Sequence, residues 1–350
     1  MARRQALPLF AAALVALAAA GASALIVQNK GGGHGEIGYH LALLLRSRSV
    51  QVTLIQDSAA KMNTPPFNSY GDLEAAGVTV KYADLAGGGL AAALEGVSPC
   101  THVFDNQNVC PRDVQNAVAA WSPKNYSYVS SGGMYKVVGD YAMSESNPVK
   151  PDNKQLANEN AAKALGLPLT AFRPQYIYGP KTNKREYIDW FLHRILGDVP
   201  IPLPKDGSLK TTLTNAKDVA SMMASVIGNE QAASREVFNC ASDVTVTHRD
   251  VISVICEVTG KNVMDVMSRV VFYNPDTLPK DLPKKGKFPF RDTHFAVSSE
   301  KAKKKLGWKC KHTLKDDLVS YYSQFLRLGL DRASFDREWD EAVITAAKGV

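Results

Sequence analysis

Cysteine is scarce in this sequence and nowhere arranged to hold a metal. There are five cysteines among 350 residues, none of them in a C-x-x-C pair or at zinc-ligand spacing. The seven histidines do not cluster either. These absences exclude a disulfide-stapled mini-protein and give no structural metal site. An odd, dispersed set of cysteines is expected to stay as free thiols in a reducing compartment.

Long apolar runs are missing after residue 27, so no transmembrane helix is expected in the mature chain. Residues 1–24 differ, because a basic start, an Ala/Leu-rich stretch and a small-residue end form the pattern of a cleaved signal or targeting segment. A membrane anchor is the alternative, but residues 25–27 are needed for the first strand. A plastid reached through the endomembrane system reconciles this leader with free thiols, and the secretory pathway is the alternative destination.

The composition shows no strong bias. Hydrophobic residues make up 45% of the chain, charged residues 21% and aromatic residues 8%, which excludes a disordered or collagen-like protein. The length suits one large α/β domain or two domains that share a cleft. A formal net charge of +7 is compatible with a polyanionic partner.

Short apolar runs alternate with helical patterns from residue 25 onward. This alternation predicts an α/β fold, a Rossmann-like doubly wound parallel sheet with a smaller C-terminal substrate or lid subdomain. Strands are predicted at 25–28, 50–55, 78–82, 101–104, 126–129, 169–173 and 236–240, and helices at 37–45, 114–121, 187–196 and 314–328. The predicted divisions are an NAD(P)-binding domain over 25–172, a mixed region over 173–330 and a tail over 331–350.

A glycine-rich loop follows the first predicted strand. Gly32, Gly35 and Gly38 form G-x-x-G-x-x-G and lead directly into a helix. The pattern predicts a dinucleotide site, because it allows a tight turn, close approach of a pyrophosphate and close helix–strand packing. Asp57 lies 19 residues beyond Gly38, where a ribose-binding carboxylate is expected. An equally good interpretation is that Asp57 caps the next helix, because Asp-Ser-Ala-Ala is a plausible N-cap.

The motifs after the fifth strand resemble the extended short-chain dehydrogenase/reductase superfamily. They are YVSSGGMY at 128–135, FRPQYIYGP at 172–180 and NAKDVA at 215–220. The resemblance implies that Ser131 occupies the position of the serine that binds the substrate carbonyl. It also implies a Tyr-x-x-x-Lys acid/base pair, but none of the 13 tyrosines has Lys four positions later. A conventional dehydrogenase or epimerase is therefore disfavoured, unless Tyr135 or Tyr141 replaces the missing tyrosine.

Further motifs resemble the chloroplast stem-loop-binding proteins, atypical superfamily members that also lack the Tyr/Lys pair. These motifs are KMNTPPFN at 61–68, SSGGMYK at 130–136, FRPQY at 172–176, FNC at 238–240, FRDTHF at 290–295 and LGW at 306–308. The resemblance implies a plastid protein that binds stem-loop RNA. It also implies Mg²⁺-assisted endoribonuclease activity and association with ribosomes or a transcription complex.

Basic residues are concentrated in one segment. Between residues 280 and 311 there are eleven basic and three acidic residues, so this segment carries +8 and the rest of the chain −1. Such a local charge favours contacts with phosphates, and interleaved aromatics suit unpaired bases. An ordinary solvated helix with core aromatics is the alternative. The RNA-binding candidates are Lys284, Lys285, Lys287, Phe290, Arg291, Lys301, Lys303, Lys304 and Lys305.

Two aspartates follow predicted strands and are candidate Mg²⁺ ligands and catalytic residues for RNA cleavage. Asp105 ends the fourth strand and Asp84 follows the third, so both are expected at the carboxyl edge of the sheet. Turn capping is the alternative for each. Three functions therefore stay open: an RNA-binding protein with weak nuclease activity, an NAD(P)-dependent nucleotide-sugar epimerase or reductase, and a non-catalytic assembly protein. A homo-oligomer is compatible with each.

Overall fold

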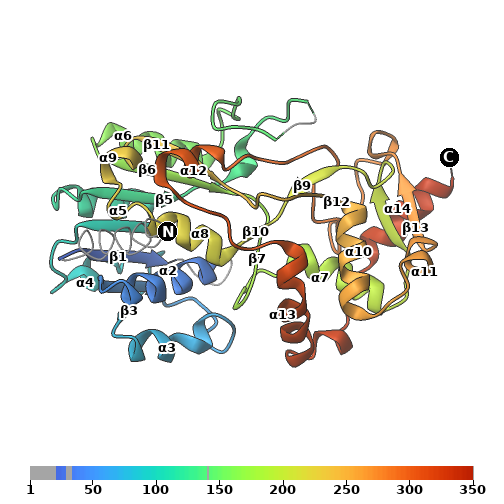
Figure 1. The fold of residues 1–350 in the computed structure, drawn as a ribbon, viewed down its shortest axis with the longest axis horizontal. Helices are drawn as coiled ribbons and strands as arrows, with labels where there is room; N and C mark the ends of the chain where they lie inside the picture. The colour runs from blue at the N-terminus through green and yellow to red at the C-terminus, as the bar shows by residue number, and fades with distance from the viewer. Residues whose placement is uncertain (1–20, 29–33, 140–141, 350) are drawn as a thin grey trace, which may run out of the picture.

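A seven-stranded parallel sheet forms the larger half of the molecule, and the computed structural model describes residues 21–28, 34–139 and 142–349 (Figure 1). Its strand order is β11-β6-β5-β4-β1-β2-β3, with every neighbouring pair parallel. The strands are β1 (Ser23–Gln28), β2 (Gln51–Asp57), β3 (Thr79–Ala83), β4 (His102–Asn106), β5 (Asn125–Val129), β6 (Leu169–Pro174) and β11 (Glu236–Cys240). The predicted fold class is confirmed.

Helices cover both faces of this sheet, which explains why its central strands are buried throughout. They are α2 (Gly35–Ser47), α3 (Tyr70–Ala75), α4 (Leu90–Leu94), α5 (Pro111–Ala119), α6 (Lys154–Ala164), α8 (Ala216–Ala224), α9 (Glu230–Ala233) and α12 (Glu300–Leu306), with the 3-10 turns η1 (Phe67–Ser69) and η2 (Gly132–Met134). Helix α2 buries Ile37, Leu41 and Leu45 completely. Because these residues repeat every four positions, they form one apolar face against the sheet.

Gly38 sets the distance between α2 and β1. A Cβ atom on Gly38 would lie only 2.2 Å from Oε1 of Gln28, the last residue of β1. Gln28 itself is fully buried and donates from Nε2 to the carbonyl of Gly35 at 2.5 Å. The helix therefore packs on the strand at a distance that only glycine permits, as the glycine pattern predicts.

The smaller half contains the rest of the elements, on the right in Figure 1. They are α7 (Glu186–Leu196), β8 (Ile201–Pro204), β9 (Lys210–Thr212), β12 (Thr245–Thr247), α10 (His248–Thr259), α11 (Val263–Met267), β13 (Val270–Tyr273), η3 (Pro275–Thr277), α13 (Leu314–Arg327), η4 (Leu330–Arg332) and α14 (Glu338–Lys348). The short strands β7 (Ile177–Tyr178) and β10 (Thr214–Asn215) pair between the halves. Strand β11 and helix α12 return to the large sheet, so residues between 173 and 330 contribute to both halves.

Residues 331–350, predicted to be a tail, contain helix α14, which packs into the smaller half. Trp339 and Val343 belong to the apolar core of the smaller half. Asp340 of the same helix is fully buried and forms a paired salt bridge with Arg194, at 2.8 and 2.9 Å. The chain end is thus part of this half, because its apolar spacing supplies a buried helix face.

The N-terminal boundary also differs from the prediction. Strand β1 begins at Ser23, and Ala24 is fully buried between Val52 and His102 of the neighbouring strands. A boundary at residue 24 therefore falls inside the strand, and residues 1–20 lie outside the described part. Among the described residues, no helix combines the length and apolar character needed to cross a membrane. All five cysteines are free thiols, as predicted.

Candidate functional site

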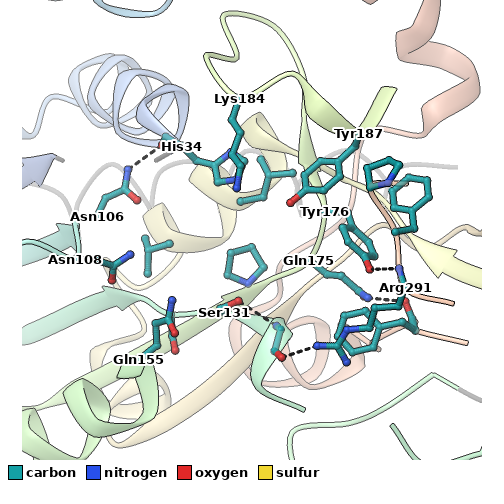
Figure 2. A pocket seen from close by; sticks show the side chains of 18 of the residues that line it. His34, Asn106, Asn108, Ser131, Gln155, Gln175, Tyr176, Lys184, Tyr187 and Arg291 are labelled. Carbon is teal, nitrogen blue, oxygen red and sulfur yellow. Dashed lines mark hydrogen bonds between the residues drawn. The ribbon is translucent and has the colours of Figure 1, made fainter. Parts of the chain in front are cut away.

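A cleft of about 550 Å³ opens between the two halves at the carboxyl ends of the sheet strands (Figure 2). Loops after β4, β5 and β6 form one wall, and segments of the smaller half form the other. Ligands of doubly wound proteins bind at this edge. The polar and aromatic side chains around it include His34, Asn106, Asn108, Ser131, Gln155, Gln175, Tyr176, Lys184, Tyr187, Lys287, Phe290 and Arg291.

The cleft is lined by cations and not by carboxylates. Lys184, Lys287 and Arg291 line it, and none of its described lining residues is Asp or Glu. Among the described residues, Lys184 pairs with Glu186 alone, at 3.1 Å, and both side chains are at least a third exposed. Such a pair holds its lysine only weakly. The cleft therefore attracts anions.

Arg291 joins the smaller half to the loop after β5. Its guanidinium donates to the carbonyl of Gly133 at 2.6 Å and lies 3.6 Å from the centre of the Phe295 ring. Burial lowers the pKa of Arg291 below its ordinary value. The backbone N–H of Arg291 donates to the hydroxyl of Tyr176 at 3.1 Å. Arg291 thus fixes one wall of the cleft and orients its central tyrosine.

Tyr176 and Tyr187 form an aromatic wall. Their ring centres are 5.0 Å apart in an edge-to-face arrangement, and Tyr187 stacks on Phe290 at 5.9 Å. Burial raises the pKa of Tyr176 to about 12, so this hydroxyl stays protonated at neutral pH. The two tyrosines remain partly exposed, which leaves ring surface available to a ligand.

The acid/base pair of hydride-transfer enzymes is absent from the described cleft. Helix α6 contributes Gln155 to the cleft, and no tyrosine–lysine pair is found on this helix. Tyr135 is fully buried, and its hydroxyl donates to Asn239 Oδ1 at 2.7 Å and accepts from Arg173 at 3.1 Å. Burial raises the pKa of Tyr135 to about 12. Tyr135 therefore does not replace the missing tyrosine, and Tyr141 lies outside the described residues.

We expect negligible hydride transfer as a consequence. Without a tyrosine whose pKa is lowered by a neighbouring lysine, no group in the described cleft relays the proton that accompanies hydride transfer. Purified protein mixed with NAD, NADP and nucleotide sugars should show no turnover above background by absorbance at the reduced-cofactor band. Turnover in the range of roughly 1–10³ per second would restore the epimerase interpretation.

Ser131 lies in the cleft wall. Its hydroxyl accepts from the N–H of Gly133 at 3.0 Å and so caps η2. The neighbouring Ser130 donates to Glu159 at 2.6 Å, and Glu159 in turn pairs with Arg173 at 2.8 Å. Ser131 is thus fixed by the turn it caps, and the residue before it is anchored to the buried Glu159–Arg173 ion pair. Its catalytic role stays a prediction.

The two candidate metal ligands occupy different environments. Asp84 is exposed and its Oδ1 accepts from the N–H of Gly87 at 2.9 Å, which is the capping alternative. Asp105 is fully buried, and Tyr126 donates to it at 2.6 Å. Within the described residues, no group of three or more His, Cys, Asp or Glu is placed to hold a metal ion. Asp84 and Asp105 therefore do not belong to a common metal-binding group within the described residues.

Replacing Asp105 with Asn should stabilise the protein at neutral and alkaline pH. Burial raises the pKa of Asp105 to about 7, from an ordinary value of about 3.9. The folded state thus keeps a proton that the unfolded state releases, and stability falls as pH rises from about 4 to 7. Asp105→Asn removes this loss, so urea unfolding should show a gain of a few kcal/mol at pH 8 and little gain at pH 4. An equal effect at both pH values would contradict the assignment.

The basic segment is more neutralised than its sequence suggests. Lys301 and Lys305 of α12 both pair with Glu236 of β11. Lys303 pairs with Asp243 and with Glu300, each at 2.7 Å. Only Lys304 of the four is exposed without such a pair among the described contacts. Lys301, Lys303 and Lys305 thus take part in ion pairs on the helix, and their contact with RNA stays a prediction.

The aromatic part of that prediction concerns Phe290. Phe290 lines the cleft, but it is only 7% exposed because it packs against Tyr176, Tyr187 and Phe191, and its contact with RNA stays a prediction. Lys284, Lys285 and Lys287 are exposed at the surface. Lys287 and Arg291 line the cleft, while Lys284 and Lys285 lie beside it. These lysines keep their predicted role as a proposal.

The sequence analysis missed several cleft residues, namely His34, Gln155, Tyr176, Lys184 and Tyr187. Tyr176 stands inside the quoted FRPQY motif, and Lys184 and Tyr187 follow it within eleven residues. Their position after a strand at the carboxyl edge was the available signal. His34 directly precedes Gly35 and is oriented by the buried carboxylate of Glu36 at 3.0 Å.

The family comparison agrees with this architecture. The sequence profile of the NAD dependent epimerase/dehydratase family matches residues 31–241. The chain belongs to this family. Among solved structures, UDP-glucuronic acid 4-epimerase from Bacillus cereus in complex with NAD has 17% identity and a TM-score of 0.65, covering 87% of this chain and 99% of that one. For dTDP-glucose 4,6-dehydratase from Bacillus anthracis in complex with NAD, these values are 16%, 0.67, 91% and 98%.

Two curated relatives come from Arabidopsis thaliana. The chloroplast stem-loop binding protein of 41 kDa b is 35% identical over 225 residues, which are 63% of this chain and 57% of that protein. A trifunctional UDP-glucose 4,6-dehydratase, epimerase and reductase is 24% identical over 215 residues, 57% of this chain and 30% of that enzyme. The matched region thus covers less than two thirds of the length of either relative.

The family implies a dinucleotide, and the described residues do not fit one. Gly32 of the glycine loop lies outside the described residues, but the N–H of Gly35 at the start of α2 already donates to Asn183 Oδ1 at 2.9 Å. Asp57 is fully buried, and one carboxylate oxygen accepts from the N–H of Ala59 at 2.9 Å. Its other oxygen has no hydrogen-bond partner in the described part, yet exposes no surface to a ribose.

Proposed function

We propose that this protein binds stem-loop RNA in plastids and holds an unpaired nucleotide of the loop in the cleft between its halves. The observation that carries the proposal is the cleft lining, which combines cations with aromatic rings and amides and has no carboxylate among its described residues. The chloroplast relative, whose name states stem-loop binding, supports RNA as the anion and the plastid as the compartment.

The cleft suits a nucleotide unit. Its volume of about 550 Å³ lies within the roughly 300–1,000 Å³ typical of small-ligand pockets. An unpaired base can stack on the exposed ring of Tyr187, while its phosphates meet Lys184 and Lys287. A duplex keeps its bases stacked inside and presents none to such a cleft. The lining therefore favours loops and single strands over stems.

The amide side chains of the cleft supply the remaining recognition chemistry. Asn108 and Gln155 face the space from the large half (Figure 2). An amide offers both donors and acceptors, so it matches the edge of an exposed base. Asn106 is already engaged, because it donates to Gln28 at 2.6 Å and to the carbonyl of His34 at 3.0 Å. Base contacts are thus expected from Gln155 and from the Nδ2 group of Asn108, whose Oδ1 already accepts from the Tyr128 hydroxyl at 2.9 Å.

The salt dependence of binding tests the proposal. In a Lys184→Gln/Lys287→Gln variant, two phosphate contacts are removed, so the slope of log affinity against log salt should decrease by up to about 1.4 units for a single-stranded loop. Fluorescence anisotropy with a labelled stem-loop measures this slope. The control is Lys261→Gln/Lys315→Gln, which removes the same charge from a partly exposed and an exposed lysine that do not line the cleft.

The control variant should keep the parent slope, because its lysines pair with Asp198 and Glu257 and none of these residues lines the cleft. Equal slopes for both variants would show that only net charge matters and would remove the cleft from the proposal. Binding of a perfectly paired duplex as tight as that of the stem-loop would have the same consequence, since the cleft offers a duplex no base contacts.

A further inference from the structure

Four successive residues, Pro180 to Asn183, run across the first helix of the large half and are called the 180–183 strap here. The carbonyl of Pro180 accepts from His40 Nε2 on α2 at 3.0 Å. Lys181 Nζ donates to Ser69 Oγ in η1 at 2.5 Å. The strap leads into α7, so it ties the smaller half to the large one.

The other two strap residues contact the start of α2 itself. Thr182 donates to the Glu36 carboxylate at 3.0 Å, and Asn183 Oδ1 accepts from the N–H of Gly35 at 2.9 Å. Glu36 is fully buried, so its negative charge lies in the first turn of the helix. Helix N-termini bind anions because their first N–H groups are unpaired. In this protein the N–H of Gly35 already has an acceptor, and the Glu36 carboxylate already supplies a negative charge.

The KMNTPPFN motif closes the same position from a second side. A Cβ atom on Gly35 would lie 2.8 Å from the ring of Phe67 and 3.3 Å from Pro66. Phe67 is 2% exposed, so its ring is packed against the helix start. The Phe67 ring alone therefore explains why position 35 is glycine, whether or not a pyrophosphate binds there.

We propose that the 180–183 strap replaces the dinucleotide in this member of the family. It takes up the N–H of Gly35 and binds the Glu36 carboxylate at the start of α2, the end of the helix that would otherwise attract the anionic pyrophosphate. The protein then folds and keeps its cleft without NAD or NADP. This inference is independent of the RNA proposal, because it concerns α2 and the strap and not the cleft lining.

Calorimetry and hydrogen exchange test the replacement together. Titration of the full chain with NAD or NADP should give no binding heat up to about 1 mM, the weak end of specific affinity. In Asn183→Ala, the amide of Gly35 should exchange faster than in the parent, because its acceptor is gone. In Asn183→Asp, an acceptor remains, so exchange should stay close to the parent.

Each outcome of these two measurements either supports or overturns the replacement of the dinucleotide by the strap. Dinucleotide binding tighter than about 1 mM by the folded parent would overturn the proposal. Unchanged Gly35 exchange in Asn183→Ala would also overturn it, since the strap would then not hold the helix start. No binding heat, with faster exchange in the alanine variant only, supports it. Circular dichroism of each variant confirms that the exchange change is local and does not follow from unfolding.

Discussion

Tyr187→Leu is expected to weaken binding of a stem-loop by roughly 10- to 100-fold, the loss of one base–aromatic stacking contact. Tyr187 lines the cleft and keeps part of its ring exposed. Leucine fills similar apolar space against Phe290 but offers no ring to a base. Tyr187→Phe keeps the ring and should bind nearly as tightly as the parent. Both affinities are measured by anisotropy at one salt concentration.

Affinity for a duplex of the same sequence is the internal control for Tyr187→Leu. Because a duplex exposes no base face, its weaker binding should be the same for the parent and the variant. A parallel loss for duplex and stem-loop would point to a distorted protein. Identical affinity of parent and Tyr187→Leu for the stem-loop would contradict stacking in the cleft.

Glu159→Gln is expected to lower the free energy of unfolding by about 3–5 kcal/mol, the cost of leaving one partner of a buried ion pair unpaired. Glu159 is fully buried and accepts from both Nε and Nη2 of Arg173, at 3.0 and 2.8 Å. A neutral amide leaves the guanidinium uncompensated inside the protein. Urea unfolding at neutral pH measures the difference.

Glu257→Gln is the matched control for Glu159→Gln. It makes the same chemical change in an exposed pair with Lys315 at 3.3 Å, where both side chains are more than half exposed. Exposed pairs contribute about 0–1 kcal/mol, so little change is expected. A loss below about 1 kcal/mol in Glu159→Gln would show that the buried pair does not support the cleft wall as described.

The sheet was predictable because each strand carries its own signal. Buried parallel strands need apolar residues on both faces, so the runs that end at Gln28 and Val129 stand out in the sequence. Gly38 was predictable for a similar local reason, since helix and strand must pack closely after the glycine loop. Tertiary contacts had no such local signal.

The site was less predictable because its partners come from distant segments. Lys301 and Lys305 share an ion pair with the single carboxylate of Glu236, more than 60 residues earlier, which a local charge count cannot show. The burial of Asp105 follows from the alternation of side chains along β4. Asp105 points to the face of Val103, into the apolar core, whereas Asn106 points to the opposite side and lines the cleft.

The central claim is that an unpaired nucleotide lies in the cleft, and photochemical crosslinking tests it most directly. A stem-loop with a photoreactive base in its loop is irradiated with the full-length protein, and the modified peptides are identified by mass spectrometry. The account predicts adducts on the segment with Tyr176, Lys184 and Tyr187. Adducts confined to residues 300–311 of α12 and its flank would contradict it.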